Sequence, residues 1–134
     1  MNDPPLVLVD SNVIIDIIQS DPDWLAWSVA NLASHEHTMI NPIIYSELCY
    51  QKTSVQELDQ LMETLDLEFE ELPREALFLA AQAFRSYRKR GGSKTSPLPD
   101  FFIGAHAATL GIPILTRDVA RYQTYYPTVH LISP

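Results

Sequence analysis

The sequence has one cysteine, Cys49, and four glycines among its 134 residues. A lone cysteine cannot form an internal disulfide, which favours a reducing compartment, and we expect a cytoplasmic protein. The few glycines form no G-x-x-x-x-G-K phosphate loop, which excludes nucleotide hydrolysis by that route. The longest apolar run, residues 13–18, is interrupted by Asp16 and falls far short of the ~20 residues of a membrane span. We therefore expect no membrane role.

Basic residues are also scarce. Nine lysines and arginines against seventeen acidic residues give a net charge of -8, which argues against binding nucleic acid through a generally basic surface. The charges are unevenly distributed, however. Residues 85–134 hold seven of the nine basic residues and only two of the acidic ones. Any contact with a polyanion is therefore expected in this C-terminal part.

The length and composition predict one globular domain over residues 1–134. Hydrophobic residues make up 46% of the chain and charged residues 19%, which is ordinary for a folded protein and excludes a disordered or collagen-like chain. Two domains would each be too small to bury a good core.

Strand and helix patterns alternate along the chain. Short apolar runs predict strands over residues 6–9, 38–41, 67–70, 112–115 and 129–132. Helical periodicity, caps and prolines predict helices over residues 13–18, 22–34, 43–51, 55–65, 75–90, 99–110 and 119–125, with a polar loop at 93–97. This alternation predicts an α/β fold, with a mostly parallel sheet covered by helices on both faces.

Four acidic residues fall at related places in this pattern. Asp10 directly follows the first strand, and Asp118 follows the strand 112–115 after two residues. Asp100 and Glu47 lie near the beginnings of their helices. Because sites in open α/β sheets form beyond the carboxyl ends of the strands, we expect these carboxylates to meet at one edge.

Four carboxylates in one pocket oppose each other's ionisation unless a cation compensates them. An acid-only cluster without histidine or cysteine favours Mg²⁺ or Mn²⁺ over Zn²⁺. One or two such ions would activate a water and stabilise the charge that develops on a phosphodiester under attack. Each acid taken alone also has a purely structural interpretation, as a turn former, a helix cap or a solvated side chain.

Four segments resemble the successive motifs of PIN-domain nucleases, and in particular those of the VapC-type ribonuclease toxins of prokaryotic toxin–antitoxin pairs. The segments are Leu8–Ile15 (LVDSNVII), Ser46–Leu48 (SEL), Leu98–Ala105 (LPDFFIGA) and Ile114–Asp118 (ILTRD). They occur in the family's order, and the resemblance spans residues 6 to 132.

The resemblance implies a Rossmann-like three-layer α/β/α sandwich with a central sheet of four or five strands. It further implies a metal-dependent RNA endonuclease, in which Asp10, Glu47, Asp100 and Asp118 are catalytic and hold one or two Mg²⁺ or Mn²⁺ ions. Supporting roles fall to Asn12, Ser46 and Thr116. The family also implies a cognate antitoxin and a homodimer. Some members carry a further acid where this chain has Ala120. This chain therefore lacks an acid that those members have, and the difference concerns the second metal position more than the first.

The basic residues of the C-terminal part have two interpretations. Five lie close together in residues 85–94, shortly before Asp100, and either guide an RNA backbone to the acids or form a solvated helix end that complements the helix dipole. Two more lie next to Asp118 and are expected to contact phosphate. The seven residues are Arg85, Arg88, Lys89, Arg90, Lys94, Arg117 and Arg121.

Two other functions remain open at this stage. An aspartyl-phosphate phosphatase also places an aspartate after its first strand, but its pattern requires a second aspartate where this chain has Asn12. A PIN-like fold kept only for protein binding is the other alternative. The four acids argue against it, because a purely adhesive domain has no reason to gather mutually repelling charges.

Overall fold

A computed structural model describes residues 6–95 and 98–134 of the chain. Within these residues the core is a five-stranded sheet in the order β3-β2-β1-β4-β5, and every neighbouring pair is parallel. The strands are β1 Leu6–Val9, β2 His37–Ile40, β3 Leu67–Phe69, β4 Ile114–Leu115 and β5 Leu131–Ile132. The predicted parallel sheet is therefore confirmed, with β1 at its centre.

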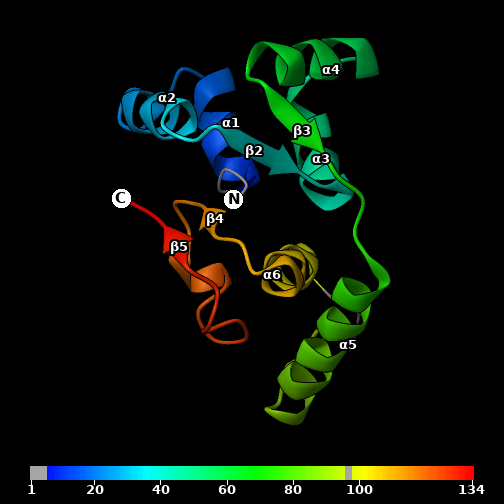
Figure 1. Ribbon diagram of the computed structural model, residues 1–134. Coiled ribbons are helices and arrows are strands. Elements are labelled where there is room, and N and C mark those ends of the chain that lie inside the picture. Colours follow the sequence, from blue (N-terminus) through cyan, green and yellow to red (C-terminus); the bar gives the residue numbers. More distant parts are fainter. Residues whose placement is uncertain (1–5, 96–97) are drawn as a thin grey trace, which may run out of the picture.

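Helices cover both faces of this sheet. They are α1 Ser11–Ile18, α2 Leu25–Ala33, α3 Pro42–Leu48, α4 Val55–Thr64, α5 Arg74–Lys89 and α6 Pro99–Leu110, with short 3-10 turns η1 Cys49–Gln51 and η2 Val119–Arg121. Helices α1 and α2 lie on one face and α6 lies on the other, with α5 packed outside α6 and α3 in contact with both α1 and α6 (Figure 1). This arrangement is the predicted three-layer α/β/α fold.

Strand β1 is apolar throughout because it is covered from both sides. Val7, Leu8 and Val9 are fully buried, as expected for the central strand of a parallel sheet. The amide of Asp10 then donates to the carbonyl of Leu115 at 2.9 Å, which continues the pairing with β4 by one residue. The ends of β1 and β4 are thereby fixed side by side, and the chain turns into α1 directly at Asp10.

Several helix ends follow the sequence signals. The side chain of Asn41 accepts from the amide of Ile44 at 2.9 Å and so caps α3, while Ser54 caps α4 through the amide of Glu57. Gly111 adopts a left-handed conformation, with a φ of 65°, and ends α6. The Asn41 cap gives α3, which carries Glu47, a well-defined beginning, whereas α6, which carries Asp100, begins at Pro99 without a side-chain cap.

Helix α2 starts later than the sequence predicts. The expected start was residue 22, but the carboxylate of Asp21 accepts from the amides of Asp23 and Trp24 and closes a turn there, so the helix begins at Leu25. Cys49 is exposed because it lies where α3 ends and η1 begins. Residues 96–97 of the predicted loop lie outside the described residues.

The predicted helix over residues 119–125 is wrong in length. Only Val119–Arg121 form a 3-10 turn, and turns follow it. The physical reason is tertiary, because the side chains of Tyr122 and Tyr126 are both buried in the core and draw the backbone inward. Strands β4 and β5 are likewise shorter than predicted, with two residues each.

The described part of the chain contains no helix that is both long and apolar enough to cross a membrane.

Candidate active site

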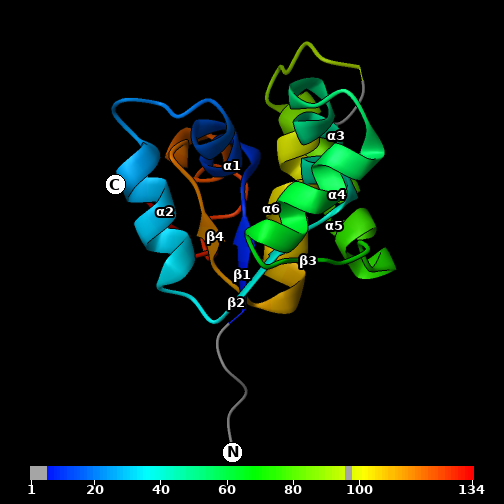
Figure 2. The same cartoon turned by 90° about the horizontal axis from the view of Figure 1, so that it is seen from above.

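The four predicted acids lie at the carboxyl-end edge of the sheet. Asp10 follows β1, Asp118 follows β4, Glu47 lies on α3, and Asp100 lies in the first turn of α6. Figure 2 shows α1 and α3 at the end toward which β1 points. Asp10 is fully buried, Glu47 and Asp100 are partly buried, and Asp118 is exposed. The cluster therefore extends from the core to the surface.

Asp10 is held by a ring of donors. Its Oδ1 accepts from the amide of Ser11 at 2.8 Å. Its Oδ2 accepts from the hydroxyls of Thr116 and Tyr122, at 2.8 and 2.7 Å, and from the amide of Asn12 at 3.2 Å. A buried carboxylate needs such donors to remain charged, and their number fixes the position of both oxygens.

Asn12 and Thr116 link the acids to one another. The side-chain amide of Asn12 also donates to the hydroxyl of Thr116, and its carbonyl accepts from the backbone amide of Arg117. The Thr116 hydroxyl in turn accepts from the amide of Asp118 at 2.9 Å. The hydrogen bonds of Asn12 and Thr116 thus connect Asp10 to the backbone of Arg117 and Asp118.

Glu47 is oriented by Ser11 and not by its neighbour Ser46. The hydroxyl of Ser11 donates to Oε1 of Glu47 at 3.0 Å. Ser46 is exposed, and its hydroxyl donates to the carbonyl of Ile43 on its own helix. Sequence reasoning missed Ser11, whose only signal was its place between Asp10 and Asn12.

Arg121 lies between two of the acids. Its Nη1 donates to Oδ1 of Asp10 at 2.8 Å, and its Nη2 donates to Oε2 of Glu47 at 3.2 Å. Burial alone would lower the pKa of Arg121, but the surrounding carboxylates of Asp10, Glu47 and Asp100 outweigh it and raise the pKa above its usual value. The guanidinium is therefore a permanent positive charge inside the acid cluster, where the sequence indicated only a phosphate contact.

The electrostatics of Asp100 place it in the same cluster. Burial raises the pKa of Asp100, and the charges of Asp10 and Asp118 raise it further, whereas its own backbone amide and Arg121 lower it. Among the described residues, no side-chain donor reaches the carboxylate of Asp100 or that of Asp118. The carboxylate of Asp118, which is exposed, is therefore open to an external cation.

The donor set fits Mg²⁺ or Mn²⁺ in kind, since it consists of carboxylate oxygens with no histidine or cysteine. Within residues 6–95 and 98–134, no three acidic, histidine or cysteine side chains are close enough together to hold one metal ion. Arg121 holds Asp10 and Glu47 through the oxygens that a metal ion would need.

Arg117 borders the open side of the site. Its guanidinium forms an ion pair with Asp16, with a contact of 3.0 Å from Nη2, and lies 5.0 Å from the ring centre of Trp24. Asp16 is buried, and no motif of the sequence pointed to it. A hollow of about 290 Å³, lined by Asn12, Arg117 and Asp118, opens beside this pair. Asp118 is thus accessible from solvent.

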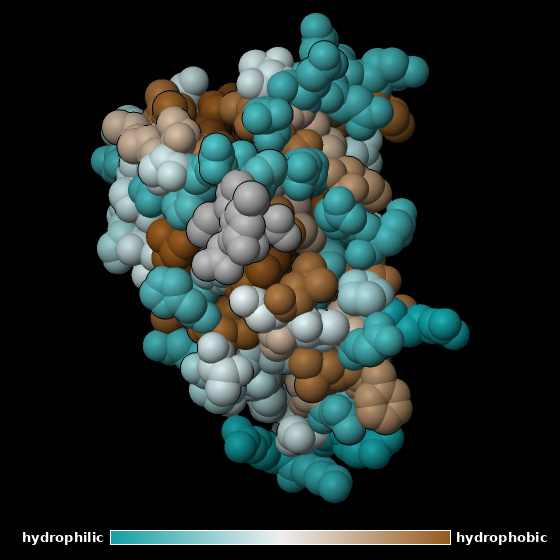
Figure 3. All heavy atoms as spheres, viewed as in Figure 1, coloured by the Kyte–Doolittle hydropathy of each residue, from teal (hydrophilic) through white to brown (hydrophobic). Residues whose placement is uncertain are grey.

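The predicted basic segment begins on the last turns of α5. All five of its basic residues are exposed, and Figure 3 shows hydrophilic residues gathered at the lower end of α5. The ring of Tyr87 lies 5.7 Å from that of Phe101, the residue after Asp100. The basic end of α5 is therefore next to the beginning of α6.

Two of these basic side chains have structural contacts. Arg88 donates to the carbonyls of Gly92 and Lys94, at 3.2 and 2.8 Å, and Arg90 lies 5.6 Å from the ring centre of Tyr125. The helix-end interpretation therefore applies to Arg88, which satisfies carbonyls of the loop that follows α5.

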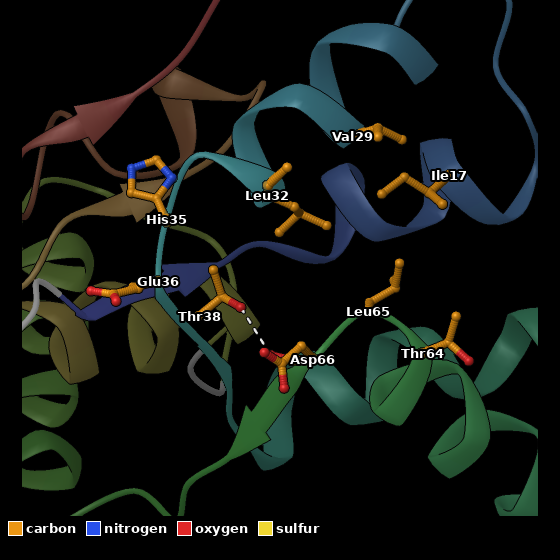
Figure 4. A pocket seen from close by; sticks show the side chains of 10 residues that line it. Ile17, Val29, Leu32, His35, Glu36, Thr38, Thr64, Leu65 and Asp66 are labelled. Carbon is orange, nitrogen blue, oxygen red and sulfur yellow. Dashed lines mark hydrogen bonds between the residues drawn. The ribbon is translucent and has the colours of Figure 1, made fainter.

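A second hollow, of about 290 Å³, lies away from the acids (Figure 4). Its walls are apolar side chains of α1, α2 and the turn before β3, such as Ile17, Leu32 and Leu65. The acidic Glu36 and Asp66 also line it. These two residues directly precede β2 and β3, so the hollow lies toward the amino ends of the strands, opposite the acid cluster.

The sequence matches one protein family, described as PIN domain, over residues 7–125. The match includes Asp10, Glu47, Asp100 and Asp118. A search of curated protein sequences found no match.

Solved structures with a similar fold include VapBC complexes. A DNA-bound VapBC from Salmonella typhimurium is 19% identical, with a TM-score of 0.70 over 95% of this chain and 96% of that one. VapBC2 from Rickettsia felis, bound to a fragment of promoter DNA, is 17% identical, with a TM-score of 0.69 over 94% and 96%. FitAcB from Neisseria gonorrhoeae is 23% identical, with a TM-score of 0.63 over 96% and 97%. At these identities the likeness shows a shared fold.

Proposed function

Since the chain belongs to the PIN-domain family, we propose that it is a metal-dependent endoribonuclease, the toxin of a VapBC-type toxin–antitoxin module. The observation that supports this most strongly is the buried carboxylate of Asp10, fixed at the end of β1 with Glu47, Asp100 and Asp118 at the same edge. These four acids are the proposed catalytic and metal-holding residues. We propose that residues 1–134 form a single domain.

In this proposal the reaction is hydrolysis of an RNA phosphodiester. A water oxygen bonds to phosphorus, the bond from phosphorus to the leaving ribose oxygen breaks, and that oxygen takes up a proton. The hydroxyls of Thr116 and Tyr122 hold the carboxylate of Asp10 in one position, so that its oxygens are already oriented when substrate binds. Asp118 is exposed and faces the substrate side.

One or two Mg²⁺ or Mn²⁺ ions, held by Asp10, Glu47, Asp100 and Asp118, would supply a water of lowered pKa and positive charge beside the phosphate. Asn12 and Thr116 fix the position of Asp10 relative to Asp118 through their shared hydrogen bonds. Ser11 has the corresponding role for Glu47.

The RNA backbone is proposed to approach over the basic end of α5. Arg85, Lys89 and Lys94 are exposed there, and Arg117 borders the hollow beside Asp118. Three of these charges lie at the end of α5 or just after it, and that end is next to the beginning of α6, where Asp100 is, whereas the rest of the chain is strongly acidic. The polyanion is thus attracted to one part of the surface and repelled elsewhere.

We also propose a cognate antitoxin as the partner, because several structures of the same fold are described as complexes of VapBC proteins. The antitoxin would cover the acid edge and exclude RNA. We further propose a homodimer and a cytoplasmic location. The large exposed side chains of Leu77 and Phe78 on α5 are compatible with a contact between two copies.

The phosphatase alternative is weakened by Asn12. Its amide is engaged by Asp10 and Thr116 and offers no acid or base to a leaving group. A non-catalytic PIN-like domain is the remaining alternative, and only an activity measurement separates it from the nuclease.

The decisive experiment is RNA cleavage by the purified chain in Mg²⁺ or Mn²⁺. We expect cleavage that stops with EDTA and is lost in Asp10→Asn and Asp118→Asn, with Asp23→Asn, an exposed acid of α2's leading turn, as the matched control. Asp118→Asn is informative even if Asp10→Asn fails to fold, because Asp118 is exposed. Cleavage that survives EDTA or Asp118→Asn contradicts the proposal, as does release of phosphate from small esters with RNA left intact.

A further inference from the structure

Arg121 occupies a cation position inside the acid cluster. It lies three residues after Asp118, at the end of the short turn η2, and its side chain is only 19% exposed. From there it reaches Asp10 at the end of β1 and Glu47 on α3. Its positive charge also lowers the pKa of Asp100, against the stronger effect of burial. One guanidinium therefore offsets part of the charge of several carboxylates.

On each partner Arg121 uses the oxygen that accepts from fewer other donors of the described residues, since Oδ1 of Asp10 has one other donor, the backbone amide of Ser11 at 2.8 Å. On Asp10, Oδ2 already accepts from Asn12, Thr116 and Tyr122. On Glu47, Oε1 already accepts from Ser11. Arg121 takes Oδ1 of Asp10 and Oε2 of Glu47. Another cation that binds both carboxylates through these oxygens must therefore displace Arg121.

The guanidinium of Arg121 also has a path to solvent. Its side chain is partly exposed, and the turn that carries it spans only three residues. The hollow of about 290 Å³ beside Asp118 and Arg117 opens at the same edge. A rotation of the long Arg121 side chain into solvent would release both oxygens without moving β1 or α3.

We propose that Arg121 is an internal competitor for the metal site, so that a divalent cation binds only when the guanidinium leaves Asp10 and Glu47. This inference rests on the proposed metal-dependent function and adds its regulation. In the metal-free protein, Arg121 offsets part of the negative charge of the site and keeps it closed. When the ion concentration is high enough, the ion displaces the arginine and the acids close around it.

The size of the effect follows from the population of the open state. The apparent dissociation constant is the intrinsic one divided by the fraction of molecules whose site is free. Charge-assisted hydrogen bonds of this kind correspond to a population ratio of roughly ten- to hundredfold. Removing the guanidinium should therefore tighten Mn²⁺ binding by about that factor.

The first experiment observes the wild-type arginine directly. In ¹⁵N NMR spectra, the Nε–H signal of Arg121, assigned by its loss in Arg121→Lys, should move toward the position of a solvated arginine as Mg²⁺ saturates the site. The signal of Arg74, an exposed arginine at the start of α5, is the internal control and should stay unchanged. An Arg121 signal that does not move at saturating Mg²⁺ overturns the exchange.

The second experiment measures Mn²⁺ affinity by calorimetry in the wild type, Arg121→Gln, Arg121→Lys and the control Arg74→Gln. We expect about ten- to hundredfold tighter binding in Arg121→Gln, and a smaller gain in Arg121→Lys, which keeps the charge but cannot bridge two carboxylates. Arg74→Gln should match the wild type.

The outcomes separate this inference from the proposed function. If Arg121→Gln binds Mn²⁺ as tightly as the wild type or less tightly, the exchange is wrong, but the proposed metal site is not contradicted. If none of the four proteins binds Mn²⁺, the metal-dependent function is wrong, and the exchange is wrong with it. The wild type decides this outcome, because its fold is intact. Because the NMR measurement uses the wild type, the inference remains testable even if Arg121→Gln does not fold.

Discussion

The hydroxyl of Tyr122 donates a 2.7 Å hydrogen bond to Oδ2 of Asp10, a residue 112 positions earlier in the chain, and both side chains are fully buried. Burial raises the pKa of the Tyr122 phenol, and the charge of Asp10 raises it further, so the phenol remains a donor at any physiological pH. This bond ties the segment after β4 to the end of β1. It also explains why that segment leaves the helical path after Arg121.

We predict that Tyr122→Phe destabilises the fold by about 1–2 kcal/mol. The substitution removes one donor from a buried carboxylate that keeps its other donors, so the cost is that of a partly unsatisfied charge. Urea unfolding measures it. Tyr45→Phe is the matched control, because the Tyr45 hydroxyl bonds to Asp59 at the surface. Equal free energies of unfolding in the two variants would contradict the role given to the buried bond.

The contrast between Asp10 and Tyr122 shows which parts of the site are predictable from sequence. Asp10 directly follows an apolar run that forms a strand in any α/β arrangement, so its place at a carboxyl end follows from local pattern alone. Tyr122 reaches the site through a contact across 112 residues that no local pattern records. The same tertiary contact overrides the helical pattern of residues 119–125.

Ser11 and Arg121 illustrate the same limit at the level of single side chains. The sequence indicated that Glu47 lies near Asp10, but not which hydroxyl orients it, and Ser11 proved to be the donor in place of Ser46. An arginine beside an acidic motif predicts a phosphate contact and an internal ion pair equally well. Only the relative placement of η2, β1 and α3 distinguishes these two.

We predict that the stability of the fold decreases as the pH falls below about 6.5, in part through His106. The Asn41 carbonyl accepts from Ile44, so its amide faces Nδ1 of His106 at 3.0 Å and requires a neutral ring that accepts there. Burial lowers the pKa of His106 below its usual value of 6.5. Below pH 6.5 the unfolded chain binds a proton that the folded one resists, so the contribution is present above that pH and is lost as the pH falls.

The measurement for His106 is the free energy of unfolding between about pH 7.5 and about pH 5.5, which lie about one unit on either side of the usual histidine pKa of 6.5. In His106→Gln, which keeps an acceptor, we expect a shallower pH dependence than in the wild type. His130→Gln, at an exposed histidine, should leave the wild-type slope unchanged. A wild-type slope in His106→Gln would show that other groups cause the acid sensitivity.

Gly104→Ala should destabilise the protein, although alanine favours helices. A Cβ at Gly104 would lie 2.2 Å from Cδ2 of the buried Tyr126 ring, on which α6 packs directly. The helical gain of about 1 kcal/mol is outweighed by overpacking, and we expect a net loss of about 1–2 kcal/mol. In a Tyr126→Ala background the same change should become stabilising. Thermal unfolding of the four proteins tests this, and additive effects would contradict the close packing.

The basic end of α5 should determine the salt dependence of RNA binding. We predict that Arg85→Gln combined with Lys89→Gln weakens binding and lowers the slope of log K against log[salt] by about 0.7 for each phosphate that these two side chains neutralise in the wild type. Asp118→Asn serves as the background so that the RNA is not cleaved. Arg88 is left intact because it supports the loop after α5.

The matched control for the basic residues is Arg74→Gln, at the other end of the same helix. It removes an exposed positive charge far along α5 from Asp100, so it should leave the salt slope unchanged. If the control lowers the slope as much per charge as the double variant does, the attraction is a matter of net charge and the RNA path over the end of α5 is wrong. If neither lowers it, the backbone contacts lie elsewhere, and Arg117, which lines the hollow next to Asp118, is the next basic residue to substitute.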